Sequence, residues 1–142
     1  MRTVRQLLDA KPPAVYAIGP DAPVLDAVKL MAEKHIGAVL VMEEGRLAGI
    51  VTERDYARKV VLQGRSSAQT RVREIMTPEV VCVGLDDTTT RCMQIVTERR
   101  IRHLPVRDGD AVLGVVSIGD LVKAVIEDQQ LEITQLQRYI SS

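Results

Sequence analysis

The chain has 142 residues, of which 46% are hydrophobic and 27% are charged, a composition typical of a globular domain. Its 19 basic residues balance its 19 acidic residues, so no net field would attract nucleic acid or an anionic membrane. With three Tyr and no Trp or Phe, the sequence also lacks the aromatic platforms on which single-stranded nucleic acid stacks. Nucleic-acid and membrane partners are therefore disfavoured.

The longest apolar runs are too short to span a bilayer, and the N-terminus lacks the charged-then-apolar pattern of a signal peptide. We therefore expect a cytoplasmic protein. Cys82 falls in a predicted strand and Cys92 in a predicted helix, with neither metal-ligand spacing nor a disulfide framework. Each cysteine is interpreted as a small buried hydrophobe.

The first half of the chain begins with a short helical lead-in at residues 3–9, followed by a β-branched strand at 15–18. Asp21 is the predicted cap of a helix whose apolar residues recur at helical spacing, namely Val24, Val28 and Met31. Apolar runs at 38–42 and 47–51 then predict a hairpin, and a further helix completes a βαββα order.

The second half repeats the first at a fixed offset of 65 residues, with its own lead-in at 71–76. The offset holds without a gap from Pro13, which matches Pro78, to Asp55, which matches Asp120. It predicts a strand at 80–83, a cap at Asp86, a helix carrying Thr89, Met93 and Val96, and a hairpin from 104–106 and 112–116. We therefore expect a first repeat with its lead-in at 1–64, a linker at 65–70, a second repeat at 71–128 and a helical extension at 129–142.

Neither half can cover its small sheet and apolar helix face alone. We therefore expect a mixed α/β fold in which the two halves pack face to face about a pseudo-twofold axis. The C-terminal extension differs, because its apolar stripe steps by four and three in alternation through Val122, Ile126, Gln129, Ile133, Leu136 and Ile140. This stripe either folds back on its own domain or meets a partner, and the pattern leaves both open.

A hydroxyl residue followed three positions later by Asp recurs where the last strand of each half ends, as Thr52 with Asp55 and Ser117 with Asp120. Such a pair can cap a helix N-terminus in a short-armed capping box. The same helix end can hold a phosphate, and the Asp can accept from the hydroxyls of a ribose. The pairs are therefore interpreted either as helix caps alone or as parts of a nucleotide site.

These doubled segments, with Ile101-Arg102-His103-Leu104-Pro105-Val106 before the last hairpin strand, resemble tandem cystathionine β-synthase (CBS) domain proteins, or Bateman modules. The resemblance covers almost the entire chain and is to a stand-alone module. It implies clefts between the repeats that bind AMP, ADP, ATP, NAD or S-adenosylmethionine, and regulation of a protein target that the sequence does not name. It also implies flat homodimers, and NAD is as compatible with the ribose contacts as the mononucleotides are.

The resemblance assigns ribose and phosphate contacts to Thr52, Asp55, Ser117 and Asp120. Arg54 has no cationic counterpart at Gly119, so the two clefts should differ in phosphate binding. The base pocket and a phosphate-facing cation are assigned to Arg102, His103 and Pro105, which the first repeat replaces with Gly37, Ala38 and Leu40. The resemblance also places two pairs of strand residues where adenine is sandwiched and meets backbone groups, namely Tyr16 with Ala17 and Val81 with Cys82.

Simpler structural interpretations stay open for several of these residues. Arg102, His103 and Tyr16 are also ordinary strand or hairpin residues, and Arg58 with Lys59 is interpreted as a solvated helix face. A structural oligomerisation module with decayed clefts is the alternative to a nucleotide sensor, because the first repeat lacks Arg, His and Pro together. An enzyme is disfavoured, since there is no Walker-type loop, metal cluster or nucleophile paired with a base.

Overall fold

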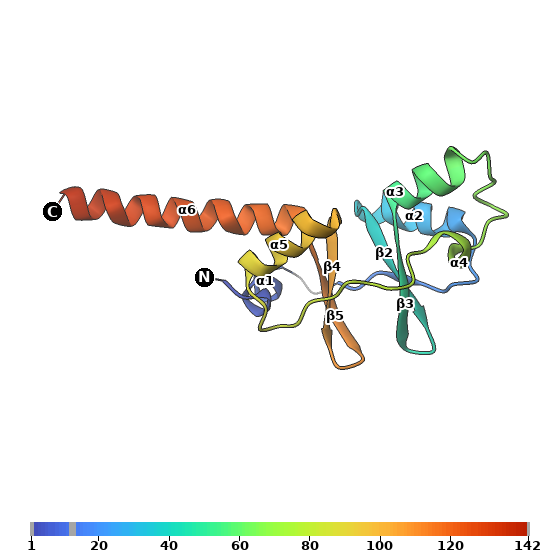
Figure 1. Ribbon diagram of the computed structural model, residues 1–142, viewed down its shortest axis with the longest axis horizontal. Helices are drawn as coiled ribbons and strands as arrows, with labels where there is room; N and C mark the ends of the chain where they lie inside the picture. Colours follow the sequence, from blue (N-terminus) through green and yellow to red (C-terminus); the bar gives the residue numbers. More distant parts are fainter. Residues whose placement is uncertain (1, 12–13, 142) are drawn as a thin grey trace. The chain divides into compact units, whose positions relative to one another are not determined.

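The two halves of the chain repeat each other element by element in the computed structural model, which describes residues 2–11 and 14–141 (Figure 1). Helices α2 (Val24–Lys34) and α5 (Thr89–Arg99) begin 65 residues apart, 89 minus 24. The same offset relates the two hairpins, which consist of β2 (Ala38–Glu43), β3 (Arg46–Thr52), β4 (His103–Asp108) and β5 (Ala111–Ser117). The predicted mixed α/β fold of two repeated halves is confirmed, although Pro13, where the register begins, lies outside the described residues.

The chain divides into two compact units. We call Val15–Val81 with Asp110–Val112 the first-repeat unit. The second-repeat unit comprises Met1–Ala14, Cys82–Gly109 and Leu113–Ser142.

The two lead-in helices are exchanged between the units. Helix α1 (Val4–Asp9) precedes the first repeat but belongs to the second-repeat unit, where the Val4 N–H donates to the carbonyl of Asp87 at 2.8 Å. Helix α4 (Val72–Ile75) precedes the second repeat but belongs to the first-repeat unit, where the Val72 N–H donates to the carbonyl of Ala22 at 2.9 Å. Helices this short are not stable alone, so these tertiary contacts hold them in place.

The first-repeat unit contains a three-stranded sheet in the order β1-β2-β3. The short strand β1 (Ala17–Ile18) pairs in parallel with β2, and β2 pairs with β3 in an antiparallel hairpin. Apolar residues of α2, the hairpin, α4 and the helical turn after β3 form one buried core: Val24, Ala27, Met31, Val39, Val41, Val51, Val60, Val72 and Ile75.

The expected strand at 80–83 is wrong except at its last residue, because Val83 makes only an isolated parallel bridge to Val106. In the first repeat, the Leu40 N–H donates to the carbonyl of Tyr16 at 3.0 Å and extends the pairing. The residue equivalent to Leu40 is Pro105, which has no N–H, so this bond cannot be repeated at Val81. The strand expected at 15–18 is likewise shortened to two residues.

The predicted helix caps at Asp21 and Asp86 are also wrong. Helix α2 follows Pro23 without a side-chain cap, and Thr88 caps α5 by accepting from the Arg91 N–H at 3.1 Å. In each repeat the chain first makes a tight turn, closed by a bond from Ala22 to Gly19 or from Asp87 to Gly84, and the helix cap lies two residues later than predicted. Asp21 and Asp86 are instead exposed and pair with arginines.

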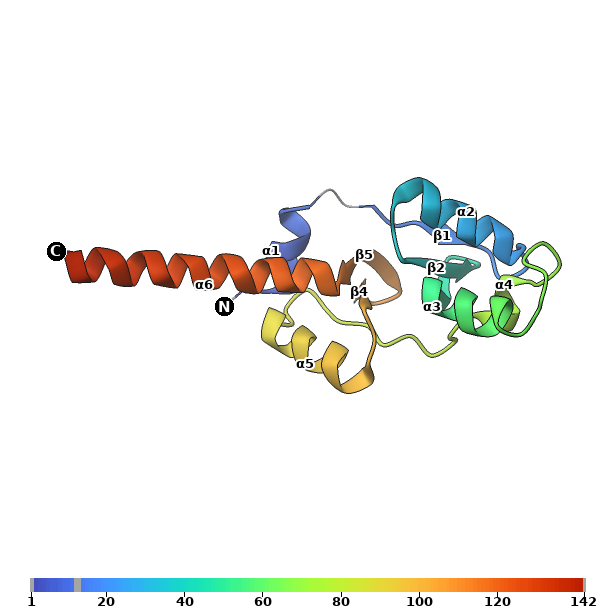
Figure 2. The same ribbon diagram turned by 90° about the horizontal axis from the view of Figure 1, so that it is seen from above.

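The helices that close the two repeats differ in length. In the first repeat, α3 (Glu53–Tyr56) continues into one π-helical turn, η1 (Ala57–Val61), and then ends. In the second, α6 (Ile118–Ser141) has 24 residues and packs against α5 near its start. Its C-terminal half extends past α1 and α5, with no other element of its unit beside it in either view (Figures 1 and 2). Among the described helices, α6 included, none combines the length and hydropathy needed to cross a membrane.

Candidate functional site

The first hydroxyl–Asp pair lies where β3 ends and α3 begins. The Thr52 N–H donates to Oδ2 of Asp55 at 3.0 Å, and the Asp55 N–H donates to Oγ1 of Thr52 at 3.1 Å. This is the predicted capping box, and it fixes the Asp55 carboxylate, whose side chain is only 15% exposed. The pair therefore presents a preorganised carboxylate beside a helix N-terminus.

Lys59 completes this first site. Its ammonium lies 3.2 Å from Oδ1 of Asp55 and donates to the carbonyl of Ile75 at 2.9 Å. Lys59 lies on an exposed helix face as expected, with its side chain 45% exposed, but its ammonium also contacts a carboxylate and a backbone oxygen. The spacing of four residues from Asp55 is the sequence signal that could have revealed the contact.

The second pair has the same geometry where β5 ends and α6 begins. The Ser117 N–H donates to Oδ2 of Asp120 at 2.9 Å, and the Asp120 N–H donates to Oγ of Ser117 at 3.1 Å. Here the cation is Lys11, whose ammonium donates to Oδ2 of Asp120 and to the carbonyl of Val115, both at 2.8 Å. No local pattern in the sequence points to Lys11, because it lies more than 100 residues from the groups it contacts.

The two sites differ in which carboxylate oxygen meets the lysine. At Asp120 the Ser117 N–H and the Lys11 ammonium both donate to Oδ2, so neither contact occupies Oδ1. At Asp55 the cap occupies Oδ2 while Lys59 contacts Oδ1. A ribose hydroxyl would therefore find Oδ1 of Asp120 open to accept, whereas at Asp55 it would share Oδ1 with Lys59.

The contacts of Asp120 predict a specific acid sensitivity. Burial raises its pKa, but the hydrogen bond from Lys11, the Ser117 N–H and the Lys11 charge outweigh burial and hold the pKa below its ordinary value of 3.8. The ionised Asp120 carboxylate therefore stabilises the folded protein. This contribution is complete above the unfolded-state pKa and is lost as the pH falls through the lower folded-state pKa. Denaturant unfolding below about pH 5 should show a steeper stability loss for wild type than for Lys11→Met.

Lys34→Met is the matched control, because the Lys34 side chain is 39% exposed, close to the 37% of Lys11, and pairs with Glu33. The free energy of unfolding of Lys34→Met should fall with decreasing pH in the same way as that of wild type. Parallel acid profiles for wild type and Lys11→Met would contradict the assignment.

The start of each hairpin lies beside the hydroxyl–Asp pair of its own repeat. Ala38 is the register partner of Thr52, and the carbonyl of Gly37 accepts from the Glu53 N–H at 3.0 Å. The equivalent carbonyl, of Arg102, accepts from the Ile118 N–H at 2.8 Å. Each backbone bond ties the residue before the hairpin to the first turn of the closing helix.

The other predicted residues lie on the strands or the adjoining loops. His103 and Pro105 are in β4, with Pro105 buried and His103 half-buried. Tyr16 is half-buried, and the Lys34 ammonium lies 5.6 Å from its ring centroid. Exposed positions are Ala17 in β1, Arg54 in α3, Arg102 before β4 and Gly119 in α6, whereas Val81 and Cys82 are half-buried in the loop before Val83.

The two cysteines are free, and the expectation of a buried thiol holds fully for Cys92. Burial, and to a smaller degree the negative charge of Asp87, raises the pKa of Cys92 to about 11. Burial also raises the pKa of Cys82, although the positive charge of Arg107 opposes this shift. Both are therefore thiols at neutral pH. No cluster of metal-binding side chains occurs within residues 2–11 and 14–141.

This burial predicts an order of alkylation. In the native protein at pH 8, iodoacetamide should modify half-buried Cys82 slowly and Cys92 only after unfolding, which peptide mass spectrometry can follow. Equal rates for the two cysteines would contradict it.

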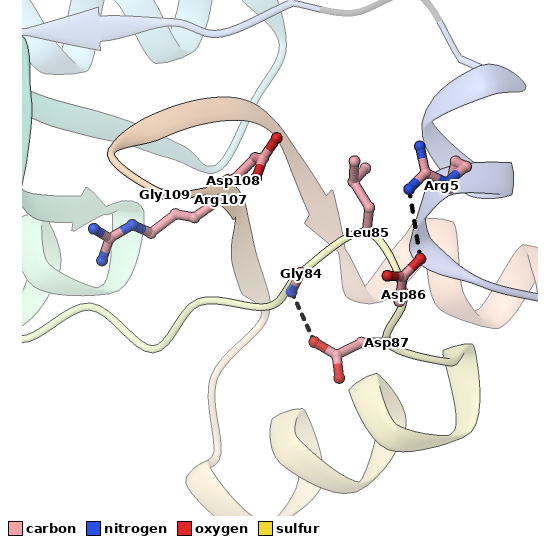
Figure 3. Close-up of a pocket in the computed structure, with 8 residues that line it drawn as sticks. All are labelled: Arg5, Gly84, Leu85, Asp86, Asp87, Arg107, Asp108 and Gly109. Atoms are coloured by element: carbon pink, nitrogen blue, oxygen red, sulfur yellow. Dashed lines mark hydrogen bonds and ion pairs between the residues drawn. The ribbon is translucent and has the colours of Figure 1, made fainter.

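A pocket of about 400 Å³ lies elsewhere in the second-repeat unit, between α1, the loop before α5 and the turn of the second hairpin (Figure 3). It is lined by Arg5, Gly84, Leu85, Asp86, Asp87, Arg107, Asp108 and Gly109. Its charges are partly paired, since Arg5 lies 3.4 Å from Asp86, and the Gly84 N–H donates to Asp87 at 2.7 Å. None of its lining residues belongs to the predicted ligand set.

Comparison with known proteins finds one family model that matches the chain twice. The CBS domain model matches residues 4–62 and 72–127. Over 125 residues the chain is 46% identical to the mitochondrial CBS domain-containing protein CBSX3 of Arabidopsis thaliana, an alignment covering 84% of this chain and 61% of that protein. The chain thus spans less than two thirds of the length of this relative.

Two solved structures are similar. A protein with CBS domains from Burkholderia ambifaria MC40-6 is 57% identical, with a TM-score of 0.87 over 90% of this chain and 96% of that chain. The CBS domain pair of protein MJ0100, solved in complex with 5′-methylthioadenosine and S-adenosyl-L-methionine, is 25% identical, with a TM-score of 0.79 over 90% of this chain and 98% of that one. Because the family match falls on the same two halves that the structure repeats, this chain belongs to the CBS-domain family and carries two copies of the domain.

Proposed function

We propose that this CBS-domain pair is a regulatory module that binds an adenosine-containing ligand and relays its presence to a protein target. The observation that carries the proposal is the duplicated hydroxyl–Asp pair, in which the cap fixes each carboxylate at a helix start. A carboxylate held in this way can accept from ribose hydroxyls without first losing side-chain freedom. The adenosine ligands in the MJ0100 complex support this class of ligand.

We propose two clefts between the repeats at 1–64 and 71–128. One would combine Val81, Cys82, Arg102, His103 and Pro105 with Thr52, Arg54 and Asp55. Pro105 supports this assignment, because without an N–H it leaves the Val81 carbonyl without the bond that Tyr16 receives from Leu40. That carbonyl would accept from the exocyclic amino group of adenine, while Arg102 and Arg54 would face phosphate.

The second cleft would combine Tyr16, Ala17, Gly37 and Ala38 with Ser117, Gly119 and Asp120. It has fewer cations, since Gly37 and Gly119 replace Arg102 and Arg54. We therefore expect it to prefer a ligand with less phosphate charge than the first cleft does. AMP, ADP, ATP and NAD are the proposed ligands, with S-adenosylmethionine, which has no phosphate group, as the comparison.

A ligand that contacts both repeats would bias their relative orientation by its difference in affinity for the two arrangements. The output would pass to a protein partner, and the protein would act as a cytoplasmic homodimer without catalysis. Neither nucleic acid nor a membrane is a proposed partner, because the formal charge is balanced.

Thermal unfolding with AMP, ADP, ATP, NAD and S-adenosylmethionine tests the proposal. A ligand at about a hundred times its dissociation constant should stabilise the folded protein by about 2.7 kcal/mol. GMP is the matched control for AMP, because it differs in the base and keeps the ribose and phosphate. Chromatography of the nucleotides after incubation checks for turnover, which would point to an enzyme instead.

A structural oligomerisation module is the second candidate, favoured by the exposed apolar residues of α6. It predicts a folded oligomer whose unfolding temperature responds to none of the five compounds. That result would count against the sensor.

A further inference from the structure

Helix α6 has two faces with different surroundings. The face turned to its own unit carries Leu121 and Ala124, which are buried, and the acidic residues Glu127 and Asp128. Arg2 pairs with both of these acids, at 2.8 and 3.0 Å. These contacts fix which side of α6 faces the second-repeat unit.

The opposite face carries the apolar stripe, and this stripe is exposed along its whole length. Exposed fractions are 43% for Val122, 59% for Ile126, 47% for Ile133, 61% for Leu136 and 81% for Ile140. Val122 and Ile126 are exposed even though they lie on the same part of α6 as the buried Leu121 and Ala124. Within the described residues, the stripe therefore does not fold back on its own unit.

We propose that a second copy of this chain covers the stripe, by pairing α6 with α6 in a parallel, in-register two-stranded coiled coil. The stripe follows heptad spacing, with Ile126, Ile133 and Ile140 at a positions and Val122, Gln129 and Leu136 at d positions. Ile at a with Leu at d favours parallel dimers over larger bundles. This assigns the contact surface of the dimer, and it does not depend on nucleotide binding.

Gln129 supports an identical partner in the same direction. In a parallel, in-register pair, each d residue faces its own copy, so the two Gln129 amides can hydrogen-bond to each other. In an antiparallel pair that keeps the stripe together, a faces d, and Gln129 would face Ile133. That arrangement would bury an amide against hydrocarbon without a partner.

The charges beside the stripe favour the same arrangement. In the parallel pair, Glu132 at a g position lies next to Gln137 of the second copy, at e, so no like charges meet. The antiparallel pair would bring the two copies of Glu132 together. Because the stripe is shorter than three heptads, the dimer should dissociate on dilution.

Sedimentation of the full chain over about a hundredfold concentration range measures the monomer–dimer equilibrium and so tests whether the α6 stripe is the dimer contact. Ile133→Gln should weaken the dimer by about a hundredfold or more, because one buried Ile is lost from each chain. Leu131→Gln is the matched control, since Leu131 lies on the same helix and is 58% exposed but is off the stripe. It should change dimerisation by less than about threefold. Far-UV circular dichroism verifies that both variants are folded.

Disulfide trapping tests the direction of the pair. Ile140→Cys should form a crosslinked dimer under mild oxidation, in excess of wild type with its two native cysteines. Leu131→Cys, on the outer side of the coil, should not. An antiparallel pair would place residue 140 opposite residue 122, about 27 Å from its own copy along the axis, and would give no crosslink. A monomeric wild type, equal effects of Ile133→Gln and Leu131→Gln, or no crosslink through Ile140→Cys would each overturn the proposal.

Discussion

Asp55→Ala and Asp120→Ala should each lower the affinity of the cleft they belong to by about 10- to 100-fold. The reason is that a hydrogen bond to a charged acceptor contributes about 1.5–3 kcal/mol, and each carboxylate would accept from the ribose. At a ligand concentration of about a hundred times the wild-type dissociation constant, stabilisation of a one-site protein should fall from about 2.7 to about 0.4 kcal/mol after a hundredfold loss. Thermal unfolding with and without ligand measures both values.

The stability of each variant without ligand needs a control, because removing the capping carboxylate alone lowers the free energy of unfolding by about 1 kcal/mol. Thr88→Ala supplies it, since Thr88 caps α5 through the Arg91 N–H and is outside both proposed clefts. It should lower the unfolding temperature and keep the full ligand-dependent shift. If Asp55→Ala and Asp120→Ala kept that shift as well, the pairs would be helix caps alone.

Gly49→Ala should be among the most destabilising single-methyl additions in the chain. A Cβ at Gly49 would lie 2.8 Å from the carbonyl oxygen of Thr77 and 2.8 Å from Sδ of Met76. The Thr77 backbone cannot easily move, because it exchanges hydrogen bonds with Ile50 at 2.9 and 3.0 Å. We expect a cost of about 1–3 kcal/mol in the free energy of unfolding, measured by denaturant titration.

Gly114→Ala is the matched comparison at the equivalent position of the second repeat. Its Cβ would meet Cδ2 of Leu8 at 2.9 Å, and this flexible side chain can turn away. Its cost should be under about 1 kcal/mol, and Gly19→Ala, with nothing within 4 Å, should be close to neutral. Equal costs at Gly49 and Gly114 would contradict the contact between β3 and the segment after α4.

Local patterns predicted the repeat, the helices and the hairpins, because each depends on residues close together in sequence. The apolar spacing of α2 and α5 and the turns at Gly45 and Gly109, both with positive φ, are of this kind. The missing second-repeat strand was also readable in principle, since Pro105 removes a donor. The caps at Asp21 and Asp86 were misplaced because a tight turn precedes each helix.

Other features depend on contacts between distant segments, and local sequence carries no signal for them. The exchange of α1 and α4 between the units is one, since each helix is short and looks the same beside either repeat. At the candidate sites, the hydroxyl–Asp geometry was predictable from three-residue spacing. The contact of Lys11 with Asp120 was not, and the assignment of residues from both repeats to shared clefts stays a prediction.

Isothermal titration calorimetry of the wild-type protein with the five adenosine compounds tests the central proposal most directly. We expect saturable binding of at least one compound, and no saturable heat when the same compound is titrated into the folded Asp55→Ala/Asp120→Ala double variant. The absence of saturable heat with every compound on folded wild-type protein, or equal affinity in the double variant, would contradict a nucleotide-sensing role for the hydroxyl–Asp pairs.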